Sequence, residues 1–406
     1  MPEQPRQAPS ALPTSRPHAE RPYVFDASRL VWRLWRRRLP TGIDRVCLAY
    51  LEAFSDRSLA LLQWRDRRMV LGPRDSDALF ALLLGGAAGG LSRRRLVALL
   101  ARALPAAALR RPALAGRTYL NVGHTGLQVD SLASWLRRVG LRPVYLVHDL
   151  IPITHPHFCR AGEADKHAAR MRNVLRSAAG VILNSADTGR ELRRFAEAQG
   201  LPVPPMLVAP LGIERLPPAP SGSPHPRPYF LSIGTIEARK NHMLLLRAWQ
   251  RLRAGMGSRT PDLVLVGQRG WEAQETFAAL DAQPAGQPGR IVELGRCDDA
   301  QLACWIDHAC AMLMPSRVEG YGLPVLEALS RGTPVIASDL EVYREIAGDI
   351  PLLLDPDDEA AWASAVQEAL STGADGRRQR EALRGYAPPT WEGHMARVAD
   401  WLLTLP

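Results

Sequence analysis

The fold is decided by residues 314–327, which read MPSRVEGYGLPVLE. An apolar run ends at Met314, a glycine-rich turn follows, and Pro324 stands where a helix begins, a position at which its missing N–H costs no hydrogen bond. A strand, a turn and a helix N-terminus in this order form an anion site, because free N–H groups and the helix dipole favour negative charge. The residues expected to bind an anion through this turn are Gly320, Tyr321, Gly322 and Leu323.

Two carboxylates flank the turn: Glu319 precedes it and Glu327 lies one turn inside the helix. Carboxylates accept hydrogen bonds from hydroxyl groups and do not attract phosphate. A ligand that suits the whole turn therefore carries both phosphate and hydroxyl groups, as a sugar nucleotide does. The alternative, on spacing alone, is an ordinary strand, turn and helix with two solvated glutamates.

A second strand and turn occupy residues 231–241, LSIGTIEARKN. The strand ends at Gly234, and Arg239 and Lys240 stand at the mouth of the next helix. Cations at a helix N-terminus oppose the helix dipole, so a bound anion such as a departing pyrophosphate explains them better than chance. An exposed basic pair at a helix start is the alternative.

Short apolar runs alternate with helical patterns along most of the chain, which favours an α/β fold with parallel sheets buried on both faces. A proline-rich segment, PPAPSGSPHPRP at 217–228, can hold neither a helix nor a central strand and separates two such blocks. The predicted strands are Tyr23–Asp26, Leu59–Trp64, Thr118–Val122, Val144–His148, Gly180–Leu183, Met206–Ala209, Tyr229–Ile233, Leu263–Val266, Ile291–Leu294, Ala311–Met314 and Pro334–Ala337.

We therefore expect two doubly wound domains within the 406 residues. The predicted parts are a disordered tail (1–21), an N-terminal acceptor domain (22–212), a linker (213–228), a C-terminal donor domain (229–387) and a C-terminal helix (388–406) that packs back on the N-terminal domain. No apolar run approaches the roughly 20 residues of a membrane span, and the first residues lack the apolar core of a secretory signal. Five scattered cysteines without metal-ligand spacing are typical of a reducing cytosol.

The two decisive stretches together resemble glycosyltransferase family 4, whose retaining members carry a Glu-x7-Glu motif that Glu319 and Glu327 match. Residues 319–338 (EGYGLPVLEALSRGTPVIAS) and GTIEARKN at 234–241 are close to the family's wording. Weaker matches are Leu294-Gly295-Arg296 with Asp298-Asp299-x-x-Leu302, Thr41 to Val46 (TGIDRV), Val147 to Leu150 (VHDL) and Leu183-Asn184-Ser185 with Thr188.

The resemblance implies a GT-B fold, with two Rossmann-like domains facing each other across a cleft, and sugar transfer with retention, without a metal or other cofactor. It assigns the donor-sugar hydroxyls to Glu319, the ribose to Glu327 and the diphosphate to Arg239 and Lys240, and it places His148 near the reacting sugar. The remaining donor contacts that it implies are Gly42, Thr235 and Arg296. Thr235 departs from the pattern, because many members carry a basic residue there.

Charge is distributed unevenly: residues 1–212 hold 32 Lys and Arg against 16 Asp and Glu, whereas residues 213–406 hold 19 against 25. A basic half indicates an anionic partner. LVWRLWRRRL at 30–39 and arginine clusters at 92–111 suit an anionic membrane surface, and residues 78–115 can add an apolar acceptor-side patch. An arginine-rich amphipathic helix on the protein surface is the alternative.

The prediction is thus a cytoplasmic enzyme, peripheral on the inner membrane, that transfers a sugar to a saccharide acceptor of the lipid-linked kind used for surface polysaccharides. GDP-mannose is the expected donor, because the wording resembles bacterial polysaccharide mannosyltransferases. Three other readings stay open: a non-catalytic nucleotide-sugar-binding protein, a synthase or phosphorylase-like relative with a soluble acceptor, and a nucleic-acid-binding protein. Against the last, the chain has no recognition motif such as zinc-ligand pairs.

Overall fold

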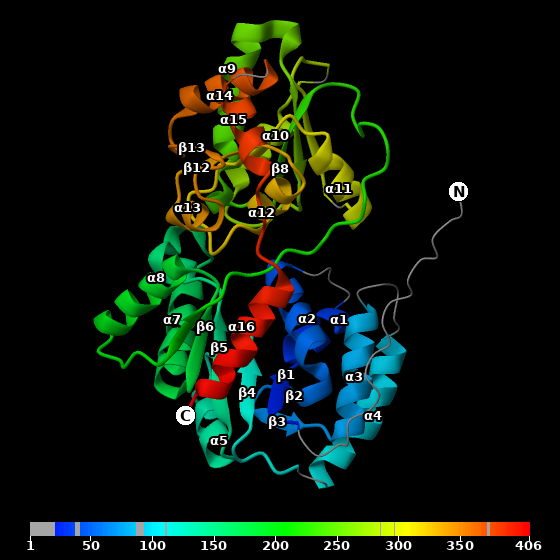
Figure 1. Cartoon of the computed structure of the whole chain (residues 1–406), viewed down its shortest axis with the longest axis vertical. Coiled ribbons are helices and arrows are strands. Elements are labelled where there is room, and N and C mark those ends of the chain that lie inside the picture. Colours follow the sequence, from blue (N-terminus) through cyan, green and yellow to red (C-terminus); the bar gives the residue numbers. More distant parts are fainter. Residues whose placement is uncertain are drawn as a thin grey trace.

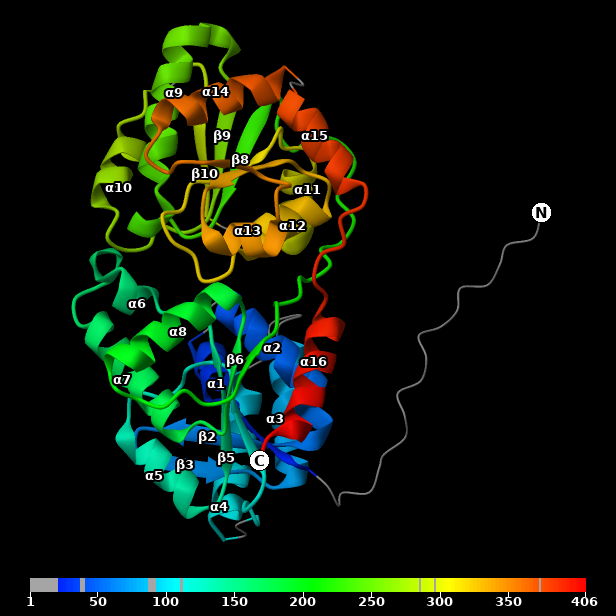
Figure 2. The same cartoon turned by 60° about the vertical axis from the view of Figure 1, so that its left-hand side comes forward.

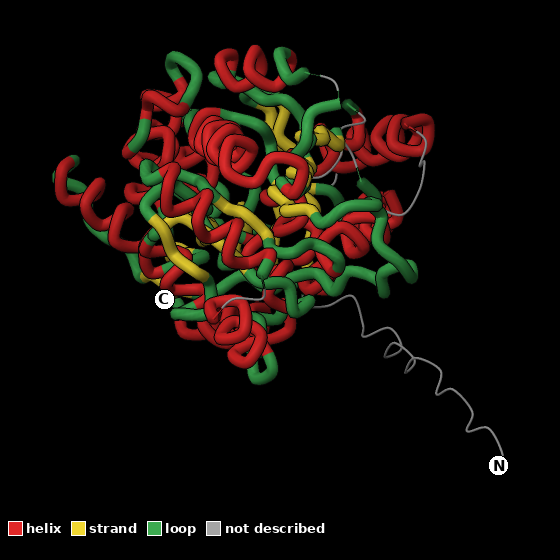
Figure 3. The backbone as a smooth tube through the Cα atoms, turned by 90° about the horizontal axis from the view of Figure 1, so that it is seen from above, coloured by secondary structure: helices red, strands yellow, loops and turns green. Residues whose placement is uncertain are grey.

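The computed structural model describes residues 21–36, 41–86, 93–109, 112–284, 286–295, 297–371 and 374–406. Of the expected tail, only Arg21 falls within these ranges, and Arg296 lies outside them. Two α/β units lie one above the other in Figure 1, the N-terminal unit below and the C-terminal unit above. In the view from above, most strands lie towards the middle of the molecule and helices lie around them (Figure 3).

The N-terminal sheet has seven strands in the order β3-β2-β1-β4-β5-β6-β7, all parallel except β3. The C-terminal sheet has six parallel strands in the order β10-β9-β8-β11-β12-β13. The bounds are β1 (Tyr23–Asp26), β2 (Ser58–Trp64), β3 (Arg67–Val70), β4 (Thr118–Asn121), β5 (Arg142–Val147), β6 (Gly180–Leu183), β7 (Met206–Val208), β8 (Tyr229–Ile233), β9 (Asp262–Val266), β10 (Ile291–Leu294), β11 (Met312–Met314), β12 (Val335–Ser338) and β13 (Leu352–Leu354).

Helices cover both faces of each sheet, as the alternating pattern predicted. Those before the linker are α1 (Ser28–Trp35), α2 (Gly42–Phe54), α3 (Pro73–Gly86), α4 (Arg93–Leu109), α5 (Asp130–Arg138), α6 (Ile151–Thr154), α7 (Glu163–Ser177) and α8 (Ala186–Ala198). Those after it are α9 (His242–Met256), α10 (Gln274–Asp281), α11 (Asp299–Asp307), α12 (Leu323–Ser330), α13 (Glu341–Ala347), α14 (Glu359–Leu370), α15 (Ala374–Leu383) and α16 (Trp391–Thr404).

The structure adds two strands to the eleven that the sequence indicated, and both lie at sheet edges. β3 reads RRMV and pairs antiparallel with β2 across a turn at Arg65, whose φ is 52°. An exposed edge strand buries little apolar surface, so it leaves no continuous apolar run in the sequence. β13 forms the far edge of the other sheet and is only partly buried.

The last helix leaves the C-terminal unit and lies against the N-terminal one. Val398 and Leu402 of α16 join the core formed by β1, β4 and α2, and α16 runs beside α2 in Figure 2. The chain therefore passes between the units twice, and the two passages touch: the Ile213 amide donates to the Pro389 carbonyl at 3.3 Å. A side chain at Gly212 would lie 2.1 Å from the backbone nitrogen of Trp391, so this crossing leaves room only for glycine.

Candidate active site

Glu319 is the centre of a buried ionic cluster at the carboxyl end of the C-terminal sheet. Its carboxylate accepts hydrogen bonds from Arg239 Nη1 at 2.7 Å and from the Ser316 hydroxyl at 2.7 Å, and it pairs with the Lys240 ammonium. Arg239 and Lys240 lie on a short 3₁₀ turn, Ala238–Lys240, that follows β8, and Glu319 follows β11. Because β8 and β11 are neighbours in a parallel sheet, their following turns meet at one edge.

The charges in this cluster are held in definite states. Burial by itself would raise the pKa of Glu319, but the Lys240 and Arg239 cations hold it at about 2. Burial lowers the pKa of Lys240, and Glu319 opposes that effect. A further carboxylate, Glu237, accepts from Arg239 Nε at 2.7 Å, and burial raises its pKa. Glu319 is therefore ionised at neutral pH and oriented by three donors.

The turn before α12 presents free amide groups beside this cluster. Within the described ranges, the N–H groups of Tyr321, Gly322 and Leu323 have no acceptor. Gly322 is the N-cap of α12 with φ of 114°, and a Cβ there would lie 2.7 Å from the Tyr343 ring. The Tyr321 side chain points away, since its hydroxyl donates to the Leu211 carbonyl at 2.9 Å. The turn can thus bind an anion through backbone groups.

A second glycine-rich turn lies against Lys240. Gly234 has φ of 144°, and a Cβ there would approach Lys240 Nζ at 3.4 Å. Gly267, after β9, lies so close that a Cβ would fall 1.9 Å from the Gly234 carbonyl oxygen, and a Cβ on Gly270 would fall 2.5 Å from the Thr235 methyl. Thr235 therefore packs against a neighbouring turn. Gly267 and Gly270 were missed by the sequence analysis, although their position after a buried strand was a usable signal.

His148 approaches the same turn from the N-terminal unit. A Cβ on Gly320 would lie 2.8 Å from the His148 carbonyl oxygen and 2.9 Å from Asp149 Cβ. The His148 ring donates from Nε2 to the Val122 carbonyl at 2.7 Å, which leaves Nδ1 as an acceptor. Burial lowers the pKa of His148 to about 4, so the imidazole is neutral at pH 7.

Two further histidines, which the sequence analysis missed, lie beside His148. The His124 ring centroid is 5.0 Å from that of His148 and 5.9 Å from that of His167. Nε2 of His124 donates to the Leu146 carbonyl at 2.9 Å, and burial lowers the pKa of both added histidines. His124 has φ of 58°, an uncommon conformation for a residue other than glycine. Because His124 and His167 are far apart in the sequence, no local pattern predicted that these histidines lie together.

The predicted glycine loop begins α2 and faces the donor turn. A Cβ on Gly42 would lie 3.9 Å from a Leu323 methyl group. Thr41 and Asp44 form a capping box at the start of α2, and Asp44 also accepts from Arg29 Nε at 2.6 Å. Arg33, which belongs to the basic stretch at 30–39, also lies 3.0 Å from Asp44, so part of that stretch supports this loop.

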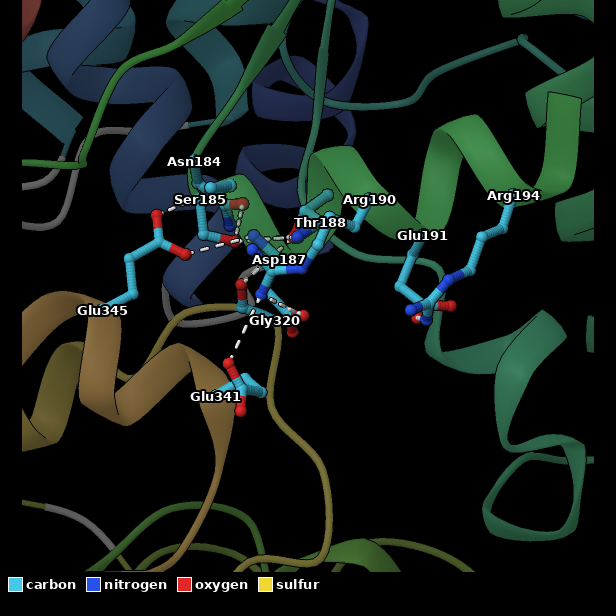
Figure 4. Close-up of polar contacts among 11 residues, drawn as sticks. Asn184, Ser185, Asp187, Thr188, Arg190, Glu191, Arg194, Gly320, Glu341 and Glu345 are labelled. Atoms are coloured by element: carbon cyan, nitrogen blue, oxygen red, sulfur yellow. Dashed lines mark hydrogen bonds and ion pairs between the residues drawn. The ribbon is translucent and has the colours of Figure 1, made fainter.

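Helices α8 and α13 make a further contact between the two units (Figure 4). The Glu345 carboxylate on α13 accepts the Ala186 and Asp187 N–H groups of α8 at 2.6 and 3.1 Å. Arg190 of α8 lies 3.7 Å from Glu341 of α13. A carboxylate at a helix N-terminus satisfies free amides and the helix dipole, so this contact stabilises the observed arrangement of the units.

The predicted basic and apolar segments of the N-terminal unit lie only partly within the described residues. Trp32 and Trp35 of α1 are each 40% exposed, and the Arg36 guanidinium lies 4.1 Å from the Trp32 ring centroid. Residues 37–40, 87–92 and 110–111 of the basic and apolar segments, like Arg296, fall outside the described ranges. Among the described helices, none has the length and apolar character that a membrane crossing needs.

Comparison with solved structures shows the fold. Over 94% of this chain and 98% of the other, the structure matches sucrose-phosphate synthase from Thermosynechococcus elongatus with a TM-score of 0.64 and 19% identity. It matches HepE of Anabaena, solved in complex with UDP, with a TM-score of 0.62, 16% identity and coverage of 94% and 99%. The chain therefore has the GT-B fold, as the sequence analysis expected.

Sequence comparison relates the C-terminal unit to a known family. Residues 227–372 match the family model described as glycosyl transferases group 1. The O-antigen chain mannosyltransferase B of Escherichia coli is 36% identical over 167 residues, which are 40% of this chain and 42% of that protein. The aligned region thus spans less than half of that relative.

Proposed function

We propose that the protein is a retaining glycosyltransferase that moves a sugar from a nucleoside-diphosphate sugar to a saccharide acceptor. The observation that carries this proposal is the meeting of Glu319, Arg239 and Lys240 beside the free amides of α12, with His148 supplied by the opposite unit. Such a site offers cations and amides to a diphosphate and a carboxylate to sugar hydroxyls. The glycosyl transferases group 1 match over residues 227–372 supports the same reaction.

In the proposed reaction, the bond between the anomeric carbon and the diphosphate oxygen breaks. The acceptor hydroxyl oxygen forms the new glycosidic bond on the same face, and its proton passes to the departing diphosphate. Lys240, Arg239 and the α12 amides stabilise the charge that develops on the diphosphate, and no metal is required. Glu319, ionised and fixed by its donors, accepts sugar hydroxyls. Neutral His148 offers Nδ1 as a hydrogen-bond acceptor near the sugar.

The finer assignments belong to the same proposal. GDP-mannose is the proposed donor, because the E. coli relative is named as a mannosyltransferase. The proposed acceptor is a lipid-linked saccharide at the cytoplasmic face of the inner membrane, where Trp32 and Trp35 of α1 and Arg36, which follows it, would contact anionic lipid. Equal binding to neutral and anionic liposomes would contradict this docking.

A thermal-shift screen against nucleoside diphosphates and their sugars tests the donor site. A ligand at 100 times its dissociation constant stabilises the folded protein by about 2.7 kcal/mol, which such a screen detects readily. We expect one base to give a shift, with GDP and GDP-mannose the strongest, followed by transfer to a saccharide acceptor in a radiolabel assay. Folded protein that responds to none of these ligands would overturn the proposal.

A further inference from the structure

Arg45 is a residue of the N-terminal unit whose side chain reaches the second glutamate of the Glu-x7-Glu motif. Its Nη1 lies 3.2 Å from Glu327 Oε1, although 282 residues separate the two in the chain. The same guanidinium has Asp299 of α11 at 3.8 Å and Glu214 of the linker at 3.9 Å. Three carboxylates from three separate segments therefore converge on one arginine.

The position of Arg45 is fixed by the helix that carries it. Arg45 lies in the first turn of α2, next to Asp44, which closes the capping box with Thr41. Arg29 Nε at 2.6 Å and Arg33 Nε at 3.0 Å from α1 hold the Asp44 carboxylate. The start of α2 is thus tied to α1, so the Arg45 side chain leaves a well-supported backbone.

Glu327 needs a cationic partner where it lies. Its side chain is 7% exposed, and burial raises its pKa; Arg45 opposes this effect, whereas the nearby Glu214 and Asp299 carboxylates add to it. Without Arg45, a buried carboxyl group beside two other carboxylates takes up a proton more readily. A protonated Glu327 offers a weaker acceptor to a hydroxyl group than the carboxylate does.

We propose that Arg45 is a positioning residue of the donor site, which crosses between the units to aim the Glu327 carboxylate at the ribose hydroxyls of the nucleotide. This inference rests on the proposed function, in which Glu327 binds the ribose. Because Arg45 and Glu327 belong to different units, their contact forms only when the units are in the observed arrangement. Binding of the ribose by Glu327 therefore depends, through Arg45, on the two units being in this arrangement.

Isothermal titration calorimetry with GDP, UDP and their 2′,3′-dideoxy counterparts tests the inference. The wild-type protein is expected to bind the ribose form of the preferred diphosphate more tightly than its dideoxy form. Arg45→Ala should lose about tenfold in affinity for the ribose form, the scale of a hydrogen bond to a charged group, and bind the dideoxy form unchanged. The loss should grow as the pH is lowered, because the unpaired Glu327 takes up a proton more readily, and Arg45→Lys should recover part of the affinity.

Two controls separate this role from a structural one. In a Glu327→Gln background, Arg45→Ala should change affinity less than twofold, since the group that it positions is already altered. Arg190→Ala removes another arginine that reaches a carboxylate of the opposite unit and should keep the ribose preference. A preserved ribose preference in both Arg45 variants, or an equal loss for ribose and dideoxy forms at every pH, would overturn the inference. Failure of the wild-type protein to bind any of these diphosphates would instead overturn the proposed function.

Discussion

Replacement of Glu319 by glutamine tests the ionic cluster most directly, because it removes one charge at nearly constant volume. The Glu319 side chain is 8% exposed, and its pKa in the folded protein is about 2 against a reference of 4.5. At about 1.36 kcal/mol per unit, this difference corresponds to roughly 3 kcal/mol of stability at pH 7. Removal of one partner from a buried ion pair typically costs about 3–5 kcal/mol, so the two magnitudes agree.

The pH dependence has a definite sign. A carboxylate whose folded-state pKa is depressed stabilises the protein above its unfolded pKa, and this stabilisation is lost as the pH falls from about 4.5 to about 2. The difference between wild type and Glu319→Gln should therefore be complete at pH 7 and fall to about half near pH 3. In Glu319→Gln, Lys240 also loses the carboxylate that opposes the lowering of its pKa by burial.

Urea unfolding followed by tryptophan fluorescence provides the assay, and the buried Trp249 and Trp362 contribute the signal of the C-terminal unit to it. The matched control is Glu359→Gln, since Glu359 pairs with Arg247 at 3.2 Å on the protein surface and should contribute less than about 1 kcal/mol. The reasoning is refuted if Glu319→Gln loses no more stability than Glu359→Gln. It is equally refuted if the difference from wild type stays constant between pH 7 and pH 3.

Four other predictions follow from the site. Lys240→Ala should lower kcat for sugar transfer by about 100-fold or more while nucleotide binding survives, because one cation at the diphosphate contributes several kcal/mol in the transition state; wild-type turnover would contradict its role. Gly322→Ala should destabilise the protein by more than about 1 kcal/mol in a thermal melt, because φ is 114° and the Tyr343 ring leaves no space. The rate should show no His148 titration between pH 6 and 8, since burial lowers its pKa to about 4 and the neutral form persists; a fall in rate near pH 6.5 that His148→Gln abolishes would refute this assignment. Treatment with EDTA should leave transfer unchanged, and loss of activity restored by a divalent cation would show that a metal takes part.

Much of the C-terminal unit could be predicted from local sequence. Strands β8 and β10 were predicted to the residue, because each is a short, mainly apolar run that a glycine follows directly. The turn after Glu319 could also be recognised, because its strand, its glycines and the proline at the start of its helix all lie within one short stretch of sequence. Binding residues that lie within a single turn can therefore be predicted from the sequence.

The sequence by itself determined the two α/β units, the proline-rich passage between them and the residues that carry charge at the donor turn. Only the tertiary structure decided which of those charges meet: Glu319 contacts Arg239 across 80 residues because β8 and β11 are neighbours in the sheet. It also decided that Arg45, His148 and Glu345 work across the boundary between the units. The physical reason is that apolar periodicity and turn chemistry act over a few residues, whereas contacts between units depend on how completed surfaces fit together.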